Sequence, residues 1–378
     1  MLNRINLFLS SLNQSLKQRN LAKDLNAFLK TEIEYIHSLP QQSEAKKGTL
    51  IIKCDDIGDF FIWQHVIPHI EEHAERPITF VCNKVLQPII EAWYDFADAY
   101  IYIDKSKWNS IDYRHDMYAE LRSVNPALAF TTLFTRNFKQ DDLLLLASDA
   151  SRRIAWDRSH HAYFSNLDIT DQILTNSIKS SVPILLEYHR NLELIEKIYK
   201  VKIDHTFKPK FPSFNKQNRL IIAPIASAKS KTWQHSNFAK LILEVLPDYE
   251  SIILLGGPNA VESCLLIQNA VNNPKLINLA GQTQLTESVP LIGESKHLLS
   301  ADTFALHIAA QTCTDTVVLS NGTNWQRFID YSDTIKSKMR PVYPPHFTPD
   351  KDKVKLRYSS SEINGIQVKT VVEALRNI

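Results

Sequence analysis

Glycine is scarce in this sequence, with eight among 378 residues, well below the average share of globular proteins. Because glycine tolerates backbone conformations and close contacts that other residues do not, each glycine here indicates a position where the backbone requires one. Neither the GxGxxG fingerprint nor the lysine-bearing P-loop motif occurs. The sequence therefore does not favour a dehydrogenase.

Cysteine and long apolar runs are also rare. The four cysteines lie far apart, without a CxxC motif or a Cys/His pairing, so we expect buried, reduced thiols in a cytoplasmic protein. No apolar run is long enough to span a bilayer, and the N-terminus contains asparagines and serines but no small-residue cleavage site. We expect neither an integral membrane protein nor export by a signal peptide.

Charge is nearly balanced, since 43 Lys and Arg face 41 Asp and Glu for a formal net charge of +2. This balance provides no bulk attraction to nucleic acid, so we expect no nucleic-acid partner and only local anion sites. His65, His69 and His73 share one helix face by their spacing, but no clear pattern of a carboxylate or fourth ligand accompanies them. We predict a solvated face and no metal site.

Short β-branched runs alternate with helical segments in both halves of the chain, which predicts an α/β protein with two doubly wound parallel sheets. The expected strands cover 49–55, 78–83, 99–104, 127–134, 219–226, 251–257, 276–280, 297–302 and 316–321, and 151–165 reads as less regular. The predicted parts are a helical N-terminal extension (1–47), a first Rossmann-like domain (48–206), a linker (207–218), a second Rossmann-like domain (219–340), and a proline-rich loop with a closing helix (341–378). In this plan ligands bind at the carboxyl ends of the strands.

The first candidate site comes after the strand at 49–55, where CDDIGDFFIW opens a helix. Gly58 would let the backbone approach a ligand, and Asp59 would project a carboxylate into the site as a general base. In the alternative interpretation, Asp55 or Asp56 caps the helix and Asp59 only favours its positive end.

The second candidate comes after the strand at 219–226 and contains Ser227, Lys229, Lys231 and Trp233. Hydroxyls and an ammonium group at a strand end can bind a diphosphate and offset charge on a leaving group. We interpret Lys229 as part of a solvated loop, whereas Lys231 next to Trp233 indicates a function beyond packing.

The third candidate is HLLSADTFALHIAAQ, a strand that leads directly into a helix. Asp302 or Thr303 is the expected N-cap, and the free N–H groups of that helix would form an anion site. His307, one turn into the helix, is typical of a packed or capped histidine.

These three motifs, in this order and each after a predicted strand, resemble glycosyltransferase family 9, the ADP-heptose:lipopolysaccharide heptosyltransferases, over about residues 48–331. The resemblance implies a GT-B fold, with two Rossmann-like domains facing a central cleft, and an inverting reaction without metal or cofactor. It makes the first domain (48–206) the acceptor side and the second (219–340) the nucleotide-sugar-binding side. It implies Asp59 as catalytic base, Ser227 and Lys231 at the donor diphosphate, Asp302 at the donor sugar, and the backbone of Thr303 and Phe304 at the phosphates. Weaker similarities place Gly58 and Glu262 on the donor nucleotide side and Arg136 on the acceptor side.

The resemblance also implies the partners. They would be a nucleotide-sugar donor similar to ADP-heptose and a glycan or glycolipid acceptor, such as lipopolysaccharide core or O-antigen, met at the inner face of the cytoplasmic membrane. Residues 1–46 have no counterpart in the family, and membrane contact, partner binding and packing back on the fold all stay open. Phe304 stands where the family has glycine, which keeps open a degenerate nucleotide- or glycan-binding protein. A sugar-nucleotide epimerase of the same architecture is the other alternative.

Overall fold

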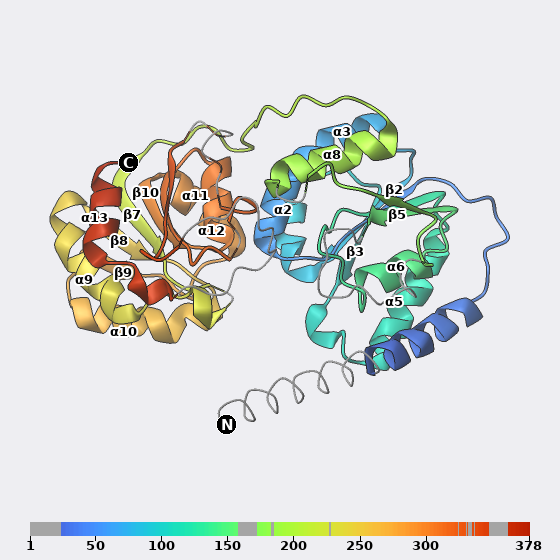
Figure 1. Ribbon diagram of the computed structural model, residues 1–378, viewed down its shortest axis with the longest axis horizontal. Helices are drawn as coiled ribbons and strands as arrows, with labels where there is room; N and C mark the ends of the chain where they lie inside the picture. Colours follow the sequence, from blue (N-terminus) through green and yellow to red (C-terminus); the bar gives the residue numbers. More distant parts are fainter. Residues whose placement is uncertain are drawn as a thin grey trace, which may run out of the picture. The chain divides into compact units, whose positions relative to one another are not determined.

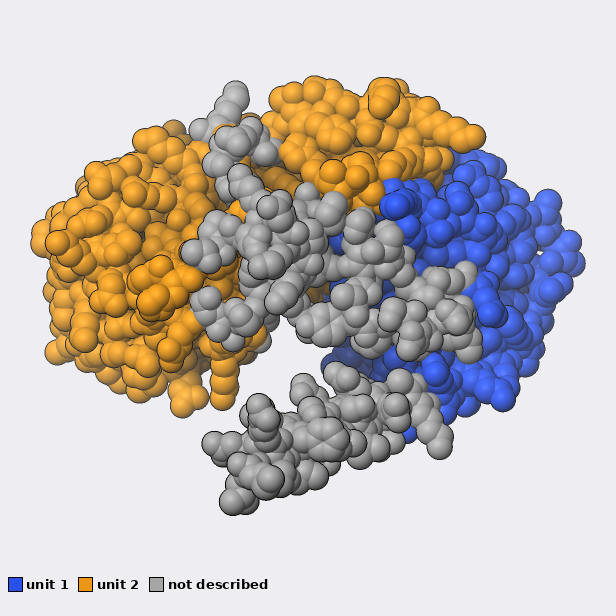
Figure 2. Space-filling view, in the orientation of Figure 1, with its two compact units in different colours: residues 1–54, 74–84, 97–179 blue, residues 55–73, 85–96, 180–378 orange. Residues whose placement is uncertain are grey.

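The computed structural model describes residues 24–157, 172–182, 185–226, 228–323, 325–329, 331, 335, 337–347 and 362–378. The chain forms two compact units, shown in separate colours in Figure 2. Unit 1 contains Met1–Cys54, Ala74–Lys84 and Ala97–Lys179, and unit 2 contains Asp55–His73, Val85–Phe96 and Ser180–Ile378. Unit 2 therefore joins two segments from the first half of the chain to the whole second half.

Unit 1 is built on a six-stranded parallel sheet with the order β3-β2-β1-β4-β5-β6. The strands are β1 (Thr49–Lys53), β2 (Ile78–Asn83), β3 (Ala99–Ile103), β4 (Leu128–Thr131), β5 (Arg152–Trp156) and β6 (Asn176–Ile178). All residues of β1 and β2 are buried, as expected for strands inside a parallel sheet that is covered on both faces.

The described helices of unit 1 are α5 (Ile111–Val124), α6 (Asp141–Ala147) and a helix whose described part covers 24–38, which Figure 1 draws in dark blue. Leu25, Leu29 and Ile36 of this first helix share one buried apolar cluster with α5, α6 and the sheet. The apolar stripe of the helix is thus covered by the unit's own core.

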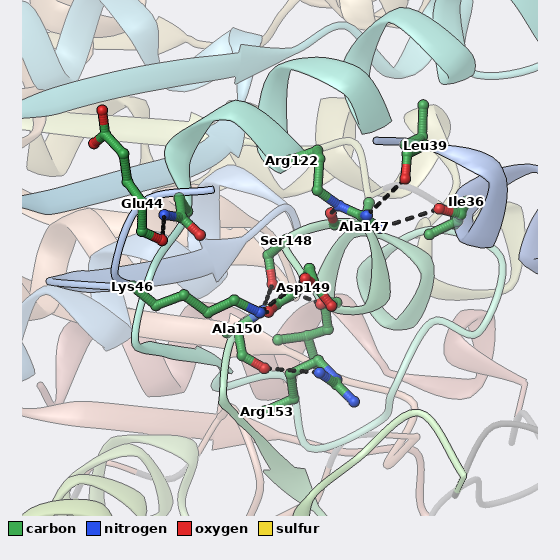
Figure 3. A network of polar contacts seen from close by, with 12 residues as sticks. Ile36, Leu39, Glu44, Lys46, Arg122, Ala147, Ser148, Asp149, Ala150 and Arg153 are labelled. Carbon is green, nitrogen blue, oxygen red and sulfur yellow. Dashed lines mark hydrogen bonds and ion pairs between the residues drawn. The ribbon is translucent and has the colours of Figure 1, made fainter. Parts of the chain in front are cut away.

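Buried polar contacts fix the first helix to α5. Nε and Nη2 of Arg114 donate to the carboxylate of Glu32, at 2.9 and 2.8 Å, and the Tyr118 hydroxyl donates to the same carboxylate at 2.8 Å. Arg122 donates to the backbone carbonyls of Ile36, Leu39 and Ala147 (Figure 3). The hydrogen bonds to the arginine and the tyrosine lower the pKa of Glu32, although burial acts in the opposite direction.

The segment after the first helix is held in the same way. Lys46 forms an ion pair of 2.8 Å with Asp149, and the Asn125 side chain donates to the Glu44 carbonyl (Figure 3). Of the roles considered for residues 1–46, packing back on the fold is the one that the described part performs.

Glu32→Ala should destabilise the protein, because it leaves the Arg114 guanidinium buried without its carboxylate. We expect a loss of about 3–5 kcal/mol in the free energy of unfolding, measured with denaturant. Glu34→Ala on the same helix is the control, since Glu34 pairs with Lys30 at 3.9 Å on the exposed surface and should change stability by less than about 0.5 kcal/mol. Equal losses in the two variants would contradict a structural role for the buried pair.

Unit 2 contains a second six-stranded parallel sheet, with the order β12-β11-β10-β7-β8-β9. Its strands are β7 (Gln217–Ala223), β8 (Ser251–Leu254), β9 (Leu276–Asn278), β10 (Ser295–Ala301), β11 (Asp315–Leu319) and β12 (Met339–Val342). β7 and β10 are neighbours, so the segments after them emerge side by side at the carboxyl edge of the sheet.

Helices cover both faces of this sheet (Figure 1). One face carries α9 (His235–Val245), α10 (Val261–Val271) and α13 (Val368–Arg376), and the other carries α11 (Leu285–Gly293) and α12 (Phe304–Gln311). The remaining helices of unit 2 come from elsewhere in the chain: α2 (Ile57–Trp63), α3 (Ile67–His73), α4 (Gln87–Trp93) and α8 (Glu187–Tyr199).

Short 3-10 turns occur in both units. They are η1 (Gln64–Val66), η2 (Lys84–Leu86), η3 (Lys105–Lys107), η4 (Lys229–Lys231), η5 (Leu246–Asp248), η6 (Pro258–Ala260) and η7 (Ile363–Gly365).

The two parallel sheets with flanking helices confirm the predicted α/β class. The sequence analysis did not predict β5, β6 and β12. β12 includes Pro341, and a sheet accepts proline at its edge, where the missing N–H breaks no ladder bond. None of the described helices is long and apolar enough to cross a membrane.

Candidate active site at the N-termini of α2 and α12

Helix α2 carries the first candidate motif. Its N-cap is Asp56, whose side chain makes no capping hydrogen bond, and Asp59 lies in the first turn. Phe60, Phe61, Ile62 and Trp63 are all buried, so packing of these residues fixes the helix. The structure therefore does not support the interpretation of Asp56 as a side-chain cap.

Gly58 allows α2 to approach α12 closely. A Cβ atom at this position would lie 2.6 Å from Cδ2 of His307 and 3.3 Å from Cα of Phe304, the first residue of α12. Further along the same interface, Gln311 of α12 donates to the Phe61 carbonyl at 2.8 Å. The turn that carries Asp59 is thereby placed beside the N-terminus of α12.

The N-terminus of α12 comes directly after strand β10. Thr303 is the N-cap, and its hydroxyl accepts a hydrogen bond from the Ala305 N–H at 3.2 Å. The side-chain cap is therefore Thr303 rather than Asp302. First-turn N–H groups that a cap leaves without an acceptor, together with the positive end of the helix dipole, favour a bound anion.

Lys231 and Asp302 form an ion pair at the same edge of the sheet. Lys231 ends η4, which comes after β7, and Asp302 comes after β10, and the Nζ to Oδ2 distance is 2.7 Å. The two side chains are only 15% and 8% exposed, so the pair is largely shielded from solvent. The neighbouring carboxylate holds the ammonium group in place.

A second buried pair lies one turn into α12. Nδ1 of His307 is 3.0 Å from the hydroxyl of Tyr331. Burial lowers the pKa of His307 to about 4. The charge of Asp302 raises this pKa by a smaller amount, and the charge of Lys231 lowers it. Burial also raises the pKa of Tyr331 well above its ordinary value, and the charge of Asp59 acts in the same direction. Asp59, His307 and the Lys231–Asp302 pair therefore influence one another within unit 2.

Six predicted site residues come together in this way: Gly58, Asp59, Lys231, Asp302, Thr303 and Phe304. Ser227 lies outside the described residues. Glu262 is exposed in the first turn of α10. Tyr331 was missed by the sequence analysis, because it lies in a segment without helical or strand periodicity.

Trp233 does not accompany Lys231 in the site. It is 1% exposed within the apolar cluster of unit 2, and its indole N–H donates to the Ile366 carbonyl at 3.2 Å. The inference that the aromatic neighbour of Lys231 signals a function beyond packing was wrong for this residue. A short sequence distance from a strand end does not determine which way a side chain points.

The prediction of a solvated face is wrong for His65, the first of the three spaced histidines. Nε2 of His65 is 2.8 Å from the Gln311 amide nitrogen, and the ring packs against Tyr188 and Phe207. Burial lowers the pKa of His65 to about 3, so the ring is neutral. In the described part of the chain, no three His, Cys, Asp or Glu side chains form a group that could hold a metal ion.

Arg136, in unit 1, makes mainly structural contacts. Its guanidinium is fully buried and donates to both carboxylate oxygens of Asp142, at 2.7 and 3.1 Å. The neighbouring Asp141 is also buried, and its Oδ1 has no hydrogen-bond partner among the described residues. An acceptor contact by Arg136, which stays a prediction, would require the guanidinium to leave this pair.

The fold and the site define a class of protein: an α/β protein with two parallel sheets, in which a carboxylate, an ammonium group and a helix N-terminus lie together at the edge of one sheet. The family model described as glycosyltransferase family 9 (heptosyltransferase) matches residues 142–346, more than half of the chain, and the chain belongs to this family.

Lipopolysaccharide heptosyltransferase 2 of Salmonella typhimurium and that of Escherichia coli are each 31% identical to this chain over 84 residues, which cover 21% of this chain and 24% of theirs. The match thus spans about a quarter of the length of these curated relatives. A family 9 glycosyltransferase from Veillonella parvula is similar in structure, with a TM-score of 0.65 at 13% identity over 88% of this chain and 97% of its own. E. coli heptosyltransferase WaaC with ADP has a TM-score of 0.62 at 12% identity over 87% and 97%. These structures agree with the GT-B fold.

Gly58→Ala should separate α2 from α12, because the new methyl group would overlap the His307 ring. We expect a loss of about 1–3 kcal/mol in the free energy of unfolding. Gly365→Ala is the control, since a Cβ there meets its nearest neighbours at 3.7 and 3.8 Å, which is ordinary contact. A Gly58→Ala protein as stable as wild type would show that the helices do not need this close approach.

Asp141→Asn should stabilise the protein at alkaline pH. Burial, and then the charge of Asp142, raise the pKa of Asp141 to about 7 from an ordinary 3.8. The folded state therefore holds a proton that the unfolded state releases, and this contribution to stability is lost as the pH rises from about 4 through 7. The asparagine variant avoids that loss. Its free energy of unfolding should exceed that of wild type by about 2–4 kcal/mol at pH 8 and by little near pH 4.

The measurement is denaturant unfolding of both proteins between pH 4 and 8. Asp116→Asn, on the exposed face of α5, is the control and should show no such growth with pH. A stability difference for Asp141→Asn that does not change with pH would contradict the assignment.

Proposed function

We propose that this chain is an inverting glycosyltransferase that moves a sugar from a nucleoside-diphosphate sugar to a hydroxyl group of a bacterial surface glycan. The observation that carries this proposal is the meeting of Asp59, the Lys231–Asp302 pair and the N-terminus of α12 in one compact unit. A base can take the proton of the attacking hydroxyl, and a cation and a helix N-terminus can stabilise the leaving diphosphate in a displacement at an anomeric carbon.

The reaction is a single in-line displacement. Asp59 accepts the proton of the acceptor hydroxyl while its oxygen forms a bond to the anomeric carbon. The bond from that carbon to the diphosphate oxygen breaks, and the nucleoside diphosphate leaves with the electron pair. One displacement on the opposite face inverts the anomeric configuration.

Groups of the chain offset the charge that develops on the leaving diphosphate. These are the Lys231 ammonium and the backbone N–H groups at Thr303 and Phe304, and they make the proposed mechanism metal-independent. Asp302 holds Lys231 at 2.7 Å and is proposed to accept a hydrogen bond from a hydroxyl of the donor sugar. Ser227 is proposed at the diphosphate, Gly58 and Glu262 on the nucleotide side, and Arg136 on the acceptor side.

The proposed donor is similar to ADP-heptose. Solved structures of E. coli WaaC contain ADP and ADP-2-deoxy-2-fluoro heptose, and the family is described as heptosyltransferases. The proposed acceptor is lipopolysaccharide core or O-antigen, since the curated relatives are lipopolysaccharide heptosyltransferases. We propose that the protein acts in the cytoplasm at the inner face of the membrane, where such glycolipids are assembled.

A panel of ADP-, UDP-, GDP- and dTDP-sugars tests the donor site by thermal shift and by slow hydrolysis of the donor. Binding followed by donor consumption supports the transferase and identifies the donor. Binding without consumption favours the degenerate nucleotide-binding protein, and interconversion of donor sugars without transfer favours the epimerase. Binding of no donor would contradict the assigned donor site.

Asp59→Asn should lower kcat by about 10²–10⁴-fold, because the amide cannot accept the acceptor proton. Donor affinity should stay within a few-fold of wild type, since the diphosphate contacts remain. Asp56→Asn, in the same turn but exposed, is the matched control and should retain most of the activity. If Asp59→Asn turns over as fast as wild type, another residue is the base.

A further inference from the structure

His307 and Tyr331 form a polar pair inside the site. The Nδ1 to hydroxyl distance is 3.0 Å, the ring centroids are 5.9 Å apart, and the residues are 5% and 0% exposed. The proposed mechanism uses neither side chain. A buried polar pair at this position needs a physical explanation.

The pair determines which nitrogen of His307 carries the proton. The lowered pKa keeps the ring neutral near pH 7, so it has one N–H group. The tyrosine keeps its hydroxyl proton, and among the described residues Nδ1 of His307 is its only acceptor. Tyr331 therefore donates to Nδ1, and the proton of the imidazole is on Nε2.

Nε2 lies at the turn that carries the proposed base. A Cβ atom on Gly58 would be 3.3 Å from Nε2 and 3.3 Å from Cα of Phe304. The charges of Asp302 and Lys231 both act on the imidazole. The N–H group of Nε2 is thus next to the first residue of α12, where we place the donor diphosphate.

Aromatic and charged neighbours hold Tyr331 in position. Its ring packs against Phe207 with centroids 6.0 Å apart, and Phe328 packs against His307 at 6.4 Å. Glu187, whose charge acts on Tyr331, accepts from the Arg327 side chain, and its backbone N–H donates to the Arg327 carbonyl at 2.9 Å. The hydroxyl of Tyr331 is therefore fixed relative to the ring of His307.

We infer that His307 is a neutral hydrogen-bond donor to a diphosphate oxygen of the bound nucleotide, and that Tyr331 is the positioning residue that fixes its tautomer. The ligand's identity rests on the proposed function. A neutral donor adds a hydrogen bond to the phosphate without placing a second full positive charge beside Lys231. It also functions unchanged across the neutral pH range.

The chain contains a matched pair away from the site. The hydroxyl of Tyr249 is 2.7 Å from Nδ1 of His297, and both residues are buried. His297 lies near the start of β10, whereas the site lies beyond the end of that strand. Loss of the Tyr249 hydroxyl removes the same kind of hydrogen bond without touching the proposed ligand site.

The test uses four variants of the full chain. His307→Asn keeps an oxygen that can accept from Tyr331 but lacks a donor at the Nε2 position, whereas His307→Gln carries an amide N–H near that position. Tyr331→Phe removes the hydroxyl that fixes the tautomer, and Tyr249→Phe is the control. The probes are ADP, UDP, GDP and dTDP, with affinities measured by calorimetry for whichever binds wild type most tightly.

We expect His307→Asn to weaken binding of that nucleoside diphosphate about 10- to 100-fold, as for loss of a hydrogen bond to a charged group. His307→Gln should stay within about threefold of wild type, Tyr331→Phe should be intermediate, and Tyr249→Phe should bind as wild type does. Nitrogen-15 NMR of histidine-labelled protein should show the His307 proton on Nε2 in wild type and a mixture of tautomers in Tyr331→Phe.

Three outcomes would overturn the inference. They are unchanged affinity in a folded His307→Asn protein, equal losses in the Asn and Gln variants that parallel their melting temperatures, and no binding of any of the four diphosphates to wild type. Failure of the proposed function looks different. Wild type would then bind a diphosphate through His307 as expected but consume no nucleotide sugar, or Asp59→Asn would keep full activity.

Discussion

The close contact between α2 and α12 is the constraint on which the rest of the site depends. Gly58 has no side chain, so the two helices approach to a distance at which any Cβ would overlap His307. This contact joins Asp59, encoded early in the chain, to Lys231 and Asp302, encoded more than 170 residues later. Gln311 donates a hydrogen bond to the Phe61 carbonyl and lies beside His65, so the contact continues along both helices.

The positive charge of Lys231 in the site is already paired before a ligand binds. Lys231 is largely shielded and is already matched by Asp302, so no unpaired cation is buried without ligand. A diphosphate that enters meets this ammonium group and the positive end of α12. His307 contributes no charge at neutral pH, because burial favours its neutral form.

The sequence was sufficient for those parts of the site that come directly after a strand. Asp59, Lys231, Asp302 and Thr303 could be predicted because parallel strands in α/β sheets place the segments beyond their carboxyl ends at one edge. Contacts between distant segments could not be predicted from local patterns. Tyr331 is in an aperiodic segment, Trp233 points into the core, and His65 packs against Tyr188 and Phe207 instead of lying on a solvated face. The apolar periodicity of residues 25–36 predicted a helix but did not identify its partner, which is the core of unit 1.

A glycine at a phosphate site can have two roles: its backbone N–H can bind the anion, and its missing side chain permits a close approach. With Phe304 in this position, the two roles fall to different residues. In the proposed site the anion is held by backbone N–H groups, and phenylalanine has the same N–H as glycine, so the donors at the start of α12 are retained. Phe304 begins the helix directly after an extended Thr303, and the cap geometry is intact without a glycine. The close approach that requires a glycine occurs instead at Gly58. A side chain at position 304 thus changes what surrounds the ligand, which bears on the choice of sugar, while the capacity to bind a diphosphate depends on groups that this substitution leaves in place.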